Sequence, residues 1–246
     1  ESVEKPLLYY RNNLVSLINL LQLMPKFGIN NIVFSSSCTV YGQADELPVT
    51  ENSPIKPATS PYGSTKQMCE NILRDTANAN ENLNAVMLRY FNPIGAHPSG
   101  EIGELPNGIP NNLLPYVTQT AIGIRKELSV FGDDYNTPDG SCIRDYINVV
   151  DLAKAHVVAI RRIINGENKK NIEVFNLGTG NGVSVLEIVK TFEKATGVKV
   201  PYRIAPRRDG DIADLEIAYK RANNLRDAEL GADVEQGLMG QAETAL

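Results

Sequence analysis

The chain of 246 residues carries 24 basic and 29 acidic side chains, a formal charge of −5, and is 42% hydrophobic. This is an ordinary globular composition, and its mild acidity excludes the basic footprint of a nucleic-acid-binding protein. No apolar run approaches the roughly 20 residues that span a bilayer, so we expect no membrane partner. The three scattered cysteines, Cys38, Cys69 and Cys142, exclude a disulfide framework and indicate a reducing, cytoplasmic compartment.

The first part of the chain alternates between helix and strand. Apolar residues at three- and four-residue spacing predict a helix over residues 6–24. An apolar run that breaks into three serines predicts a buried strand over residues 32–37. A Ser-Pro pair, typical of a helix N-cap and first turn, predicts a helix over residues 60–79. A second buried strand is expected over residues 85–91.

The rest of the chain continues the alternation after a Gly- and Pro-rich loop over residues 92–110. Strands separated by helices favour parallel βαβ units, and the sequence therefore predicts an α/β fold whose ligands bind beyond the carboxyl ends of the strands. The further expected elements are helices over residues 111–126, 149–164 and 184–196, and strands over residues 128–131, 142–148, 173–177 and 198–204.

Tyr62 and Lys66 form the first candidate site, because positions i and i+4 share one face of a helix. An ammonium beside a phenol favours the phenolate and brings a tyrosine toward acid–base work near neutral pH. The pattern alone is more often a half-exposed Tyr beside a solvated Lys. Ser37 adds weight, because its hydroxyl ends the preceding strand and fits a Ser-Tyr-Lys proton relay; the alternative is that Ser37 caps the loop backbone.

Together these motifs resemble the extended short-chain dehydrogenase/reductase family and, within it, the UDP-glucose (UDP-galactose) 4-epimerases. The resemblance is carried by seven stretches that occur in the family's order. They are SSSCTVYG at 35–42, PYGSTK at 61–66, RYFNPIGAH at 89–97, GIPNNL at 108–113, FGDDY at 131–135, RDYI at 144–147 and PRRDGD at 206–211.

The resemblance implies a Rossmann-like doubly wound parallel sheet, its N-terminal βαβ units missing, and a smaller C-terminal substrate-binding α/β domain. Residues 1–92 would be the remainder of the NAD-binding domain, and residues 93–246 mainly the nucleotide-sugar-binding domain, with some segments returning to the first. The family's G-x-x-G-x-x-G phosphate turn does not occur in these 246 residues. We therefore expect that the sequence begins inside the cofactor domain, after about 90 residues of it.

The family's functional residues carry over onto matching positions. By this resemblance, Tyr62 is the general base for the sugar 4-hydroxyl, Lys66 lowers its pKa and holds the nicotinamide ribose, and Ser37 bridges the substrate hydroxyl and Tyr62. The cofactor site would comprise Asn12, Ser37, Tyr62, Lys66, Tyr90 and Phe91. The residues expected to bind the UDP part of the substrate are Asn92, Asn112, Leu113, Ser129, Phe131, Arg144, Arg208 and Asp211.

The implied reaction is the interconversion of UDP-glucose and UDP-galactose by transient oxidation at C4 with bound NAD, an isomerase of galactose metabolism. Sister dehydratases and decarboxylases place acidic residues where this chain has Cys38 and Thr39, which favours epimerisation. The alternatives are another UDP-sugar epimerase of the same family and a non-catalytic fragment that binds UDP-sugar. The position that shapes the family's sugar pocket holds Leu215, so acceptance of N-acetylated hexoses stays open.

Two other features favour structural roles. The Gly-rich stretch 178–182 resembles a dinucleotide-binding turn, but its spacing is G-x-G-x-G and Ser184 with Glu187 forms a capping box that explains it locally. His97 and His156, the chain's two histidines, are expected to be structural, and no metal site is predicted.

A homodimer is expected by family resemblance, with helices 6–24 and 61–79 at the contact. The first of these helices is apolar nearly all round, more than a one-faced helix needs. Burial under missing N-terminal strands would explain the same pattern.

Overall fold

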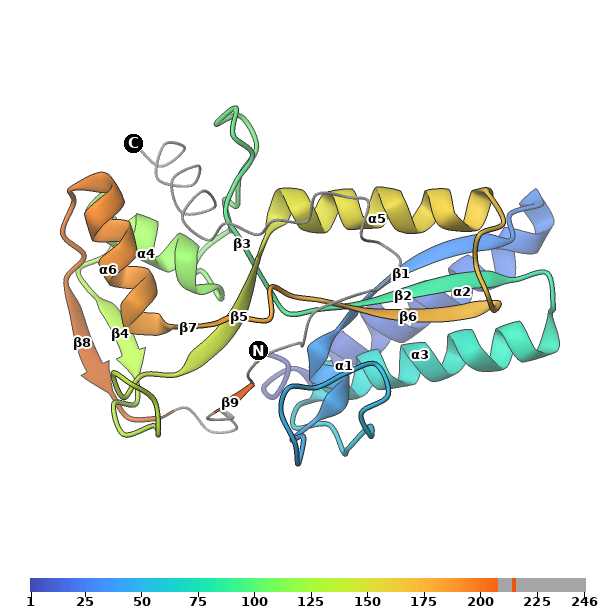
Figure 1. Ribbon diagram of the computed structural model, residues 1–246, viewed down its shortest axis with the longest axis horizontal. Coiled ribbons are helices and arrows are strands. Elements are labelled where there is room, and N and C mark those ends of the chain that lie inside the picture. The colour runs from blue at the N-terminus through green and yellow to red at the C-terminus, as the bar shows by residue number, and fades with distance from the viewer. Residues whose placement is uncertain (208–213, 216–246) are drawn as a thin grey trace. The chain divides into compact units, whose positions relative to one another are not determined.

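A computed structural model describes residues 1–207, 214 and 215 of the chain and divides into two compact units (Figure 1). The first unit comprises Glu1–Phe91 and Lys154–Leu177. The second comprises Asn92–Ala153 together with residues 178–207, 214 and 215. Among the described residues, the structure contains no helix that could span a membrane.

The first unit is built on a parallel sheet of three strands in the order β1-β2-β6. These strands are β1 (Asn31–Ser37), β2 (Asn84–Tyr90) and β6 (Ile172–Leu177). Ser37 pairs with Tyr90, and Tyr90 with Leu177, so all three strands end at the same level. The carboxyl edge of this sheet is where an α/β fold binds its ligands.

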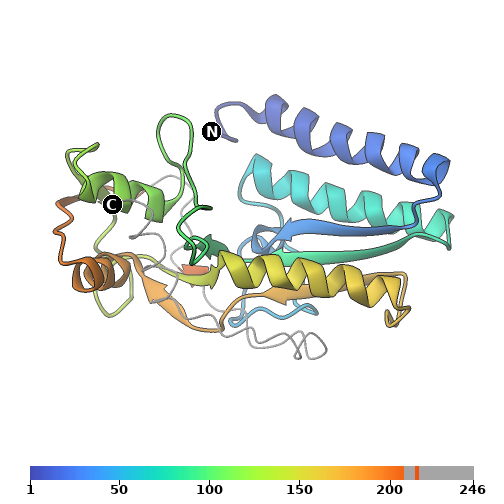
Figure 2. The same ribbon diagram turned by 90° about the horizontal axis from the view of Figure 1, so that it is seen from above.

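Helices cover both faces of this sheet (Figures 1 and 2). On one side lie α1 (Pro6–Tyr10), α2 (Ser16–Leu23) and α3 (Pro61–Ala79), and on the other lies α5 (Val149–Ile164), whose residues from Lys154 onward belong to this unit. The core between α2, α3 and the sheet consists of Leu17, Leu21, Met24, Cys69, Leu73, Ala77, Leu83, Ala85 and Met87.

The second unit contains two small sheets. In one, β5 (Ile143–Asn148) pairs in parallel with β3 (Asn92–Ile94) and β9 (Asp214–Leu215) and antiparallel with β7 (Gly182–Ser184). In the other, β4 (Leu128–Phe131) pairs in parallel with β8 (Tyr202–Ala205). The helices α4 (Leu113–Ala121) and α6 (Val185–Thr196) share a core with these strands that includes Val117, Val130, Ile188 and Val189.

Most expected elements are confirmed, and the differences have local causes. The helix expected over residues 6–24 is present but contains a π-helical turn at Arg11–Val15 between α1 and α2, and a 3-10 turn, Met24–Phe27, ends it. The helix expected over residues 111–126 ends early, where Gly123 adopts a φ of +79°, a conformation that favours glycine.

The remaining differences concern strands. The strand expected over residues 198–204 begins only at β8, while β3 lies in the expected loop 92–110 and β7 was not expected. Both β3 and β7 have three residues, too few for a recognisable alternation of apolar and polar side chains.

Candidate active site

Tyr62 lies in the first turn of α3, and local sequence determines where that helix begins. The Ser60 hydroxyl accepts a hydrogen bond from the Gly63 N–H (3.1 Å), and Pro61 occupies the first helical position. This N-cap satisfies one of the unpaired N–H groups of a helix start. Tyr62 and Lys66, four residues apart in this helix, share one of its faces.

Ser37 is buried at the carboxyl end of β1 and caps the short 3-10 helix Cys38–Tyr41. Its Oγ accepts hydrogen bonds from the backbone N–H (3.3 Å) and the hydroxyl (3.0 Å) of Thr39. The capping role considered from the sequence is therefore confirmed. The Ser37 hydroxyl also lowers the pKa of Tyr62, so the hydroxyl that orders the loop lies near the phenol.

The environment of Tyr62 raises its pKa to about 12. Burial of the phenol is the main cause, and the nearby Ser37 hydroxyl acts in the opposite direction. Cys38, Tyr9 and Tyr90 also disfavour the phenolate, and the Tyr9 ring meets the Tyr62 ring edge-on with 6.3 Å between centroids. In the chain alone, Tyr62 is thus protonated at neutral pH.

Lys66 lies near Tyr62, but its ammonium bonds to the backbone. Its Nζ donates a 2.9 Å hydrogen bond to the Ser35 carbonyl and lies 5.5 Å from the centroid of the Tyr62 ring. Burial lowers the pKa of Lys66. The expected attraction between this ammonium and the phenolate does not offset burial of Tyr62 in the chain alone.

Tyr90, Phe91 and Asn12 are the remaining residues expected at the cofactor site. Tyr90 ends β2 half-buried, with its ring 6.3 Å from that of His156, and Phe91 is buried just after it. Asn12 lies in the π-helical turn with its side chain exposed.

Asn13, which no sequence motif singles out, is the residue of this turn that faces α3. Its Nδ2 donates to the Thr65 hydroxyl (2.8 Å), which in turn donates to the Tyr62 carbonyl (2.7 Å). The π-helical turn places Asn13, and not Asn12, against α3. No local sequence pattern predicts such a turn.

His156 and His97 each contact a serine hydroxyl. His156 Nε2 lies 2.9 Å from Ser35 Oγ, and His97 Nδ1 lies 2.8 Å from Ser99 Oγ. Among the residues that the structure describes, no group of three or more His, Cys, Asp or Glu side chains is arranged to hold a metal ion.

The second unit contains a pocket of about 420 Å³ between β3, β4, β5 and the start of α4. The structure brings six of the eight predicted substrate residues together in its lining. The other two, Arg208 and Asp211, lie outside the described residues. The six are Asn92, Asn112, Leu113, Ser129, Phe131 and Arg144.

The polar side chains of this pocket are held by short contacts. Asn92 Nδ2 donates to the Asp145 carbonyl (3.1 Å), and Asn112 Nδ2 donates to the Glu104 carboxylate (2.6 Å). An Arg144 Nη1 group donates to the Ile143 carbonyl (2.7 Å). Amide and guanidinium groups of this kind suit the base, ribose and phosphate groups of a nucleotide.

Asp145 lies in the RDYI stretch at 144–147, but the family resemblance assigns it no role. Its contacts explain the Gly-rich stretch 178–182. Its fully buried carboxylate accepts hydrogen bonds from the Thr179 N–H (2.8 Å), the Thr179 hydroxyl (2.8 Å) and the Gly180 N–H (3.0 Å). These N–H groups are therefore not directed at a phosphate. The capping box of Ser184 and Glu187 at the start of α6 is also confirmed.

Comparison with known proteins agrees with this architecture. Residues 1–178 match the model of the NAD dependent epimerase/dehydratase family. The chain is 53% identical over 238 residues to UDP-glucose 4-epimerase of Bacillus subtilis (strain 168), covering 97% of this chain and 68% of that protein. It is 51% identical over 238 residues to human UDP-glucose 4-epimerase, covering 97% of this chain and 66% of that protein. The chain thus spans about two thirds of the length of these relatives.

Solved structures show the same fold. A UDP-glucose 4-epimerase from Bifidobacterium longum, in complex with NAD+ and UDP, superposes with a TM-score of 0.88 at 49% identity, over 99% of this chain and 72% of that one. The expected Rossmann-like α/β fold class is confirmed by this likeness. By sequence and by fold, the chain belongs to the NAD dependent epimerase/dehydratase family.

Proposed function

We propose that the chain is an NAD-dependent UDP-glucose 4-epimerase that interconverts UDP-glucose and UDP-galactose, a reaction of galactose metabolism. One observation carries this proposal: Ser37, Tyr62 and Lys66 lie together at the carboxyl edge of a parallel sheet. The similarity to curated UDP-glucose 4-epimerases supports the same reaction.

The first unit would hold NAD and the second the nucleotide sugar, corresponding to residues 1–92 and 93–246 with a return of residues 154–177. The donor set at the sheet edge fits the nicotinamide ribose, because Lys66 carries three N–H groups, one of them on the Ser35 carbonyl, and Tyr90 and Phe91 offer ring surfaces. When bound there, NAD would supply reversible hydride transfer at C4 of the sugar.

Tyr62 acts as the base that takes the proton from the sugar 4-hydroxyl. Because a phenol with a pKa of about 12 is protonated at neutral pH, it needs a cation nearby when the reactants are bound. The Lys66 ammonium, 5.5 Å from the ring centroid, is the cation that this chain supplies. Ser37 passes the proton between substrate and phenol.

The pocket of the second unit binds UDP. Arg144, with Arg208, neutralises the pyrophosphate, while Asn92, Asn112 and Asp211 exchange hydrogen bonds with the base and the sugars. Because the pocket would hold the UDP part and not the hexose, the sugar would be free to present either face of C4.

The substitution Tyr62→Phe tests the base assignment. It removes one hydroxyl, and we expect the turnover number with UDP-galactose to fall by about 10²- to 10⁴-fold while UDP affinity is retained. Tyr9→Phe is the matched control, since it removes the hydroxyl of the neighbouring ring, which bonds to Glu1 at the surface. Unchanged turnover in Tyr62→Phe would show that another group is the base.

The protein acts as a cytoplasmic homodimer. All three cysteines are buried and none forms a disulfide, as suits a reducing compartment. The helical segment from α1 to α2 leaves apolar side chains exposed, among them Val15, Leu20 and Leu23, each 46 to 48% exposed. Sedimentation velocity of the wild type and of Leu20→Glu measures the state, and a monomeric wild type would contradict the dimer.

A further inference from the structure

A buried ion pair lies between α3 and β2 in the first unit. Arg89 on β2 donates two hydrogen bonds to the Glu70 carboxylate on α3, from Nε over 2.8 Å and from Nη2 over 2.5 Å. Their side chains are 3% and 5% exposed. Burial alone would raise the pKa of Glu70, but the hydrogen bonds and charge of Arg89 hold it below its ordinary value. The pair is therefore charged and buried, and Glu70 also accepts a 3.3 Å hydrogen bond from the partly exposed Arg74 on the same helix.

Three more buried groups extend this pair into a network. The Ser36 hydroxyl donates to Glu70 over 2.6 Å, and Arg89 Nη1 donates to the Tyr41 hydroxyl over 2.9 Å. The Tyr41 hydroxyl donates to Asn176 Oδ1 over 2.6 Å. We call these five residues the Glu70–Arg89 network. Besides linking α3 to β2, it reaches three more segments: β1, the 3-10 turn after β1, and β6.

The network lies directly behind the candidate active site. Ser36 immediately precedes Ser37 on β1, and Glu70 lies one helical turn beyond Lys66 on α3. The Ser36–Glu70 hydrogen bond therefore ties the strand that carries the catalytic serine to the helix that carries the phenol and the ammonium. All five residues of the network belong to the first unit, whereas the UDP pocket is lined by residues of the second.

We propose that the Glu70–Arg89 network positions the proton relay, by holding α3 against β1 so that the hydroxyls of Tyr62 and Ser37 stay close to one another. This inference rests on the proposed function, because the position of Tyr62 limits turnover only if Tyr62 transfers a proton. Glu70 and Arg89 are positioning residues that touch neither substrate nor cofactor. Their loss should reduce the turnover number and leave UDP binding intact.

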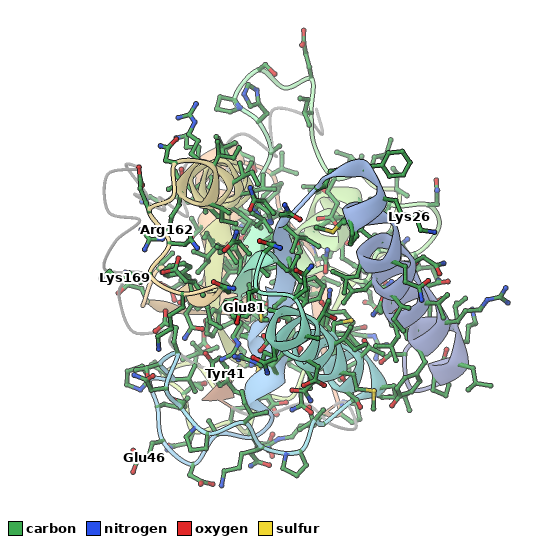
Figure 3. The ribbon with its side chains drawn as sticks, turned by 90° about the vertical axis from the view of Figure 1, so that its right-hand side faces the viewer. Lys26, Tyr41, Glu46, Glu81, Arg162 and Lys169 are labelled. Carbon is green, nitrogen blue, oxygen red and sulfur yellow. The ribbon has the colours of Figure 1, made fainter. Side chains whose placement is uncertain are left out.

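The chain supplies a matched control for this idea. Arg162 on α5 donates two hydrogen bonds to Glu173 on β6, from Nε over 2.7 Å and from Nη2 over 3.0 Å. These side chains are 8% and 10% exposed, so the pair has the same chemistry and similar burial. Figure 3 shows Arg162 well apart from Tyr41, a member of the network. Loss of this second pair perturbs the same unit without touching the relay.

The experiment compares Glu70→Gln, Ser36→Ala and Glu173→Gln in the NAD-loaded protein, with UDP-galactose as substrate. A displacement of about 1 Å in a reacting group costs about 100-fold, so we expect kcat to fall about 10- to 100-fold in Glu70→Gln. Ser36→Ala removes one hydrogen bond without stranding a charge, and its kcat should fall about 3- to 10-fold. If Glu70→Gln folds poorly, Ser36→Ala still tests the inference. KM and calorimetric UDP affinity should stay within about twofold in both, and Glu173→Gln should match the wild type.

The pH profile of kcat separates position from charge. Loss of position moves Ser37 away from Tyr62 and removes an interaction that lowers the pKa of Tyr62, so the acid limb of the profile moves to higher pH. An unpaired Arg89 cation acting only by its charge would move the limb to lower pH. The other groups that face Tyr62, namely Lys66, Tyr9, Cys38 and Tyr90, are the same in all three variants.

The outcomes decide between the inference and the proposed function. A shift of the acid limb to higher pH in Glu70→Gln and Ser36→Ala, but not in Glu173→Gln, supports positioning. If Glu70→Gln loses no more kcat than Glu173→Gln, or if its limb moves to lower pH, the inference is wrong. Unchanged turnover in Tyr62→Phe would instead overturn the proposed function on which it rests.

Discussion

Replacing Asp145 by Asn tests whether one buried carboxylate holds the Gly-rich turn of the second unit. Asp145 accepts three hydrogen bonds from Thr179 and Gly180, two of them on Oδ1 and one on Oδ2. An asparagine has the same shape but only one acceptor oxygen. Its amide N–H₂ would face the N–H donor of Gly180, so at least one contact turns from attraction to repulsion.

The expected loss depends on the number of contacts. A hydrogen bond to a charged group contributes about 1.5–3 kcal/mol, and a buried donor left without a partner adds to that loss. With one bond lost and two weakened, Asp145→Asn should reduce the free energy of unfolding by about 3 kcal/mol. For a chain of this size, that corresponds to a fall in melting temperature of about 6–12 °C.

Urea unfolding followed by circular dichroism measures this change, and calorimetric titration with UDP measures its effect on the pocket. UDP affinity should also fall, because the Asp145 carbonyl accepts the Asn92 amide and Arg144 precedes Asp145 on β5. The control is Asp134→Asn, whose carboxylate pairs with Arg207 at the surface and should leave the unfolding midpoint unchanged. Equal midpoints for the two variants would refute the reasoning.

Three further predictions concern the first unit. Gly42→Ala should lower the free energy of unfolding by about 2–3 kcal/mol, because Gly42 has a φ of +61° and a Cβ would lie 2.5 Å from the Pro57 carbonyl oxygen. The control is Gly28→Ala, which has a similar φ but open space around it and should lower the same free energy by only about 1 kcal/mol in a urea titration. Ser60→Ala should cost about 1 kcal/mol by removing the N-cap of α3, and a neutral result would show that the cap is dispensable. Because the pKa of Tyr62 is raised to about 12 from 10, its contribution to stability is complete below pH 10 and is lost as the pH rises toward 12. Between pH 10 and 12, the free energy of unfolding should therefore fall by about 2 kcal/mol less in Tyr62→Phe than in the wild type. Equal losses in the two proteins would contradict the burial of this phenol.

Elements with local signals were predictable from the sequence. The start of α3 is marked by Ser60 and Pro61, and the start of α6 by Ser184 and Glu187, because each signal includes a side chain that bonds to the backbone within three residues. The short strands β3 and β7 have no such signal. They exist because β5 offers them backbone partners, which a pattern in one segment cannot reveal.

The residues of the candidate site also differ in whether a local sequence signal predicts them. The helical spacing of Tyr62 and Lys66 and the position of Ser37 at a strand end indicated a relay without any structure. The lining of the second unit's pocket was expected only from the family resemblance, because its residues come from segments far apart in the sequence. The hydrogen bond between Tyr41 and Asn176 joins residues 135 positions apart, so no local sequence pattern predicts it.

The π-helical turn at Arg11–Val15 also has a consequence for insertions and deletions. Such a turn accommodates one residue more than an α-helical turn. Deleting Asn12 would remove that extra residue and restore regular α-helix, while the residues on either side keep their faces. Leu17 would stay in the core, and Tyr10 would stay opposite Ser64, its hydrogen-bond partner on α3. At a position outside this turn, deleting one residue would instead rotate the residues before it by about 100° relative to those after it.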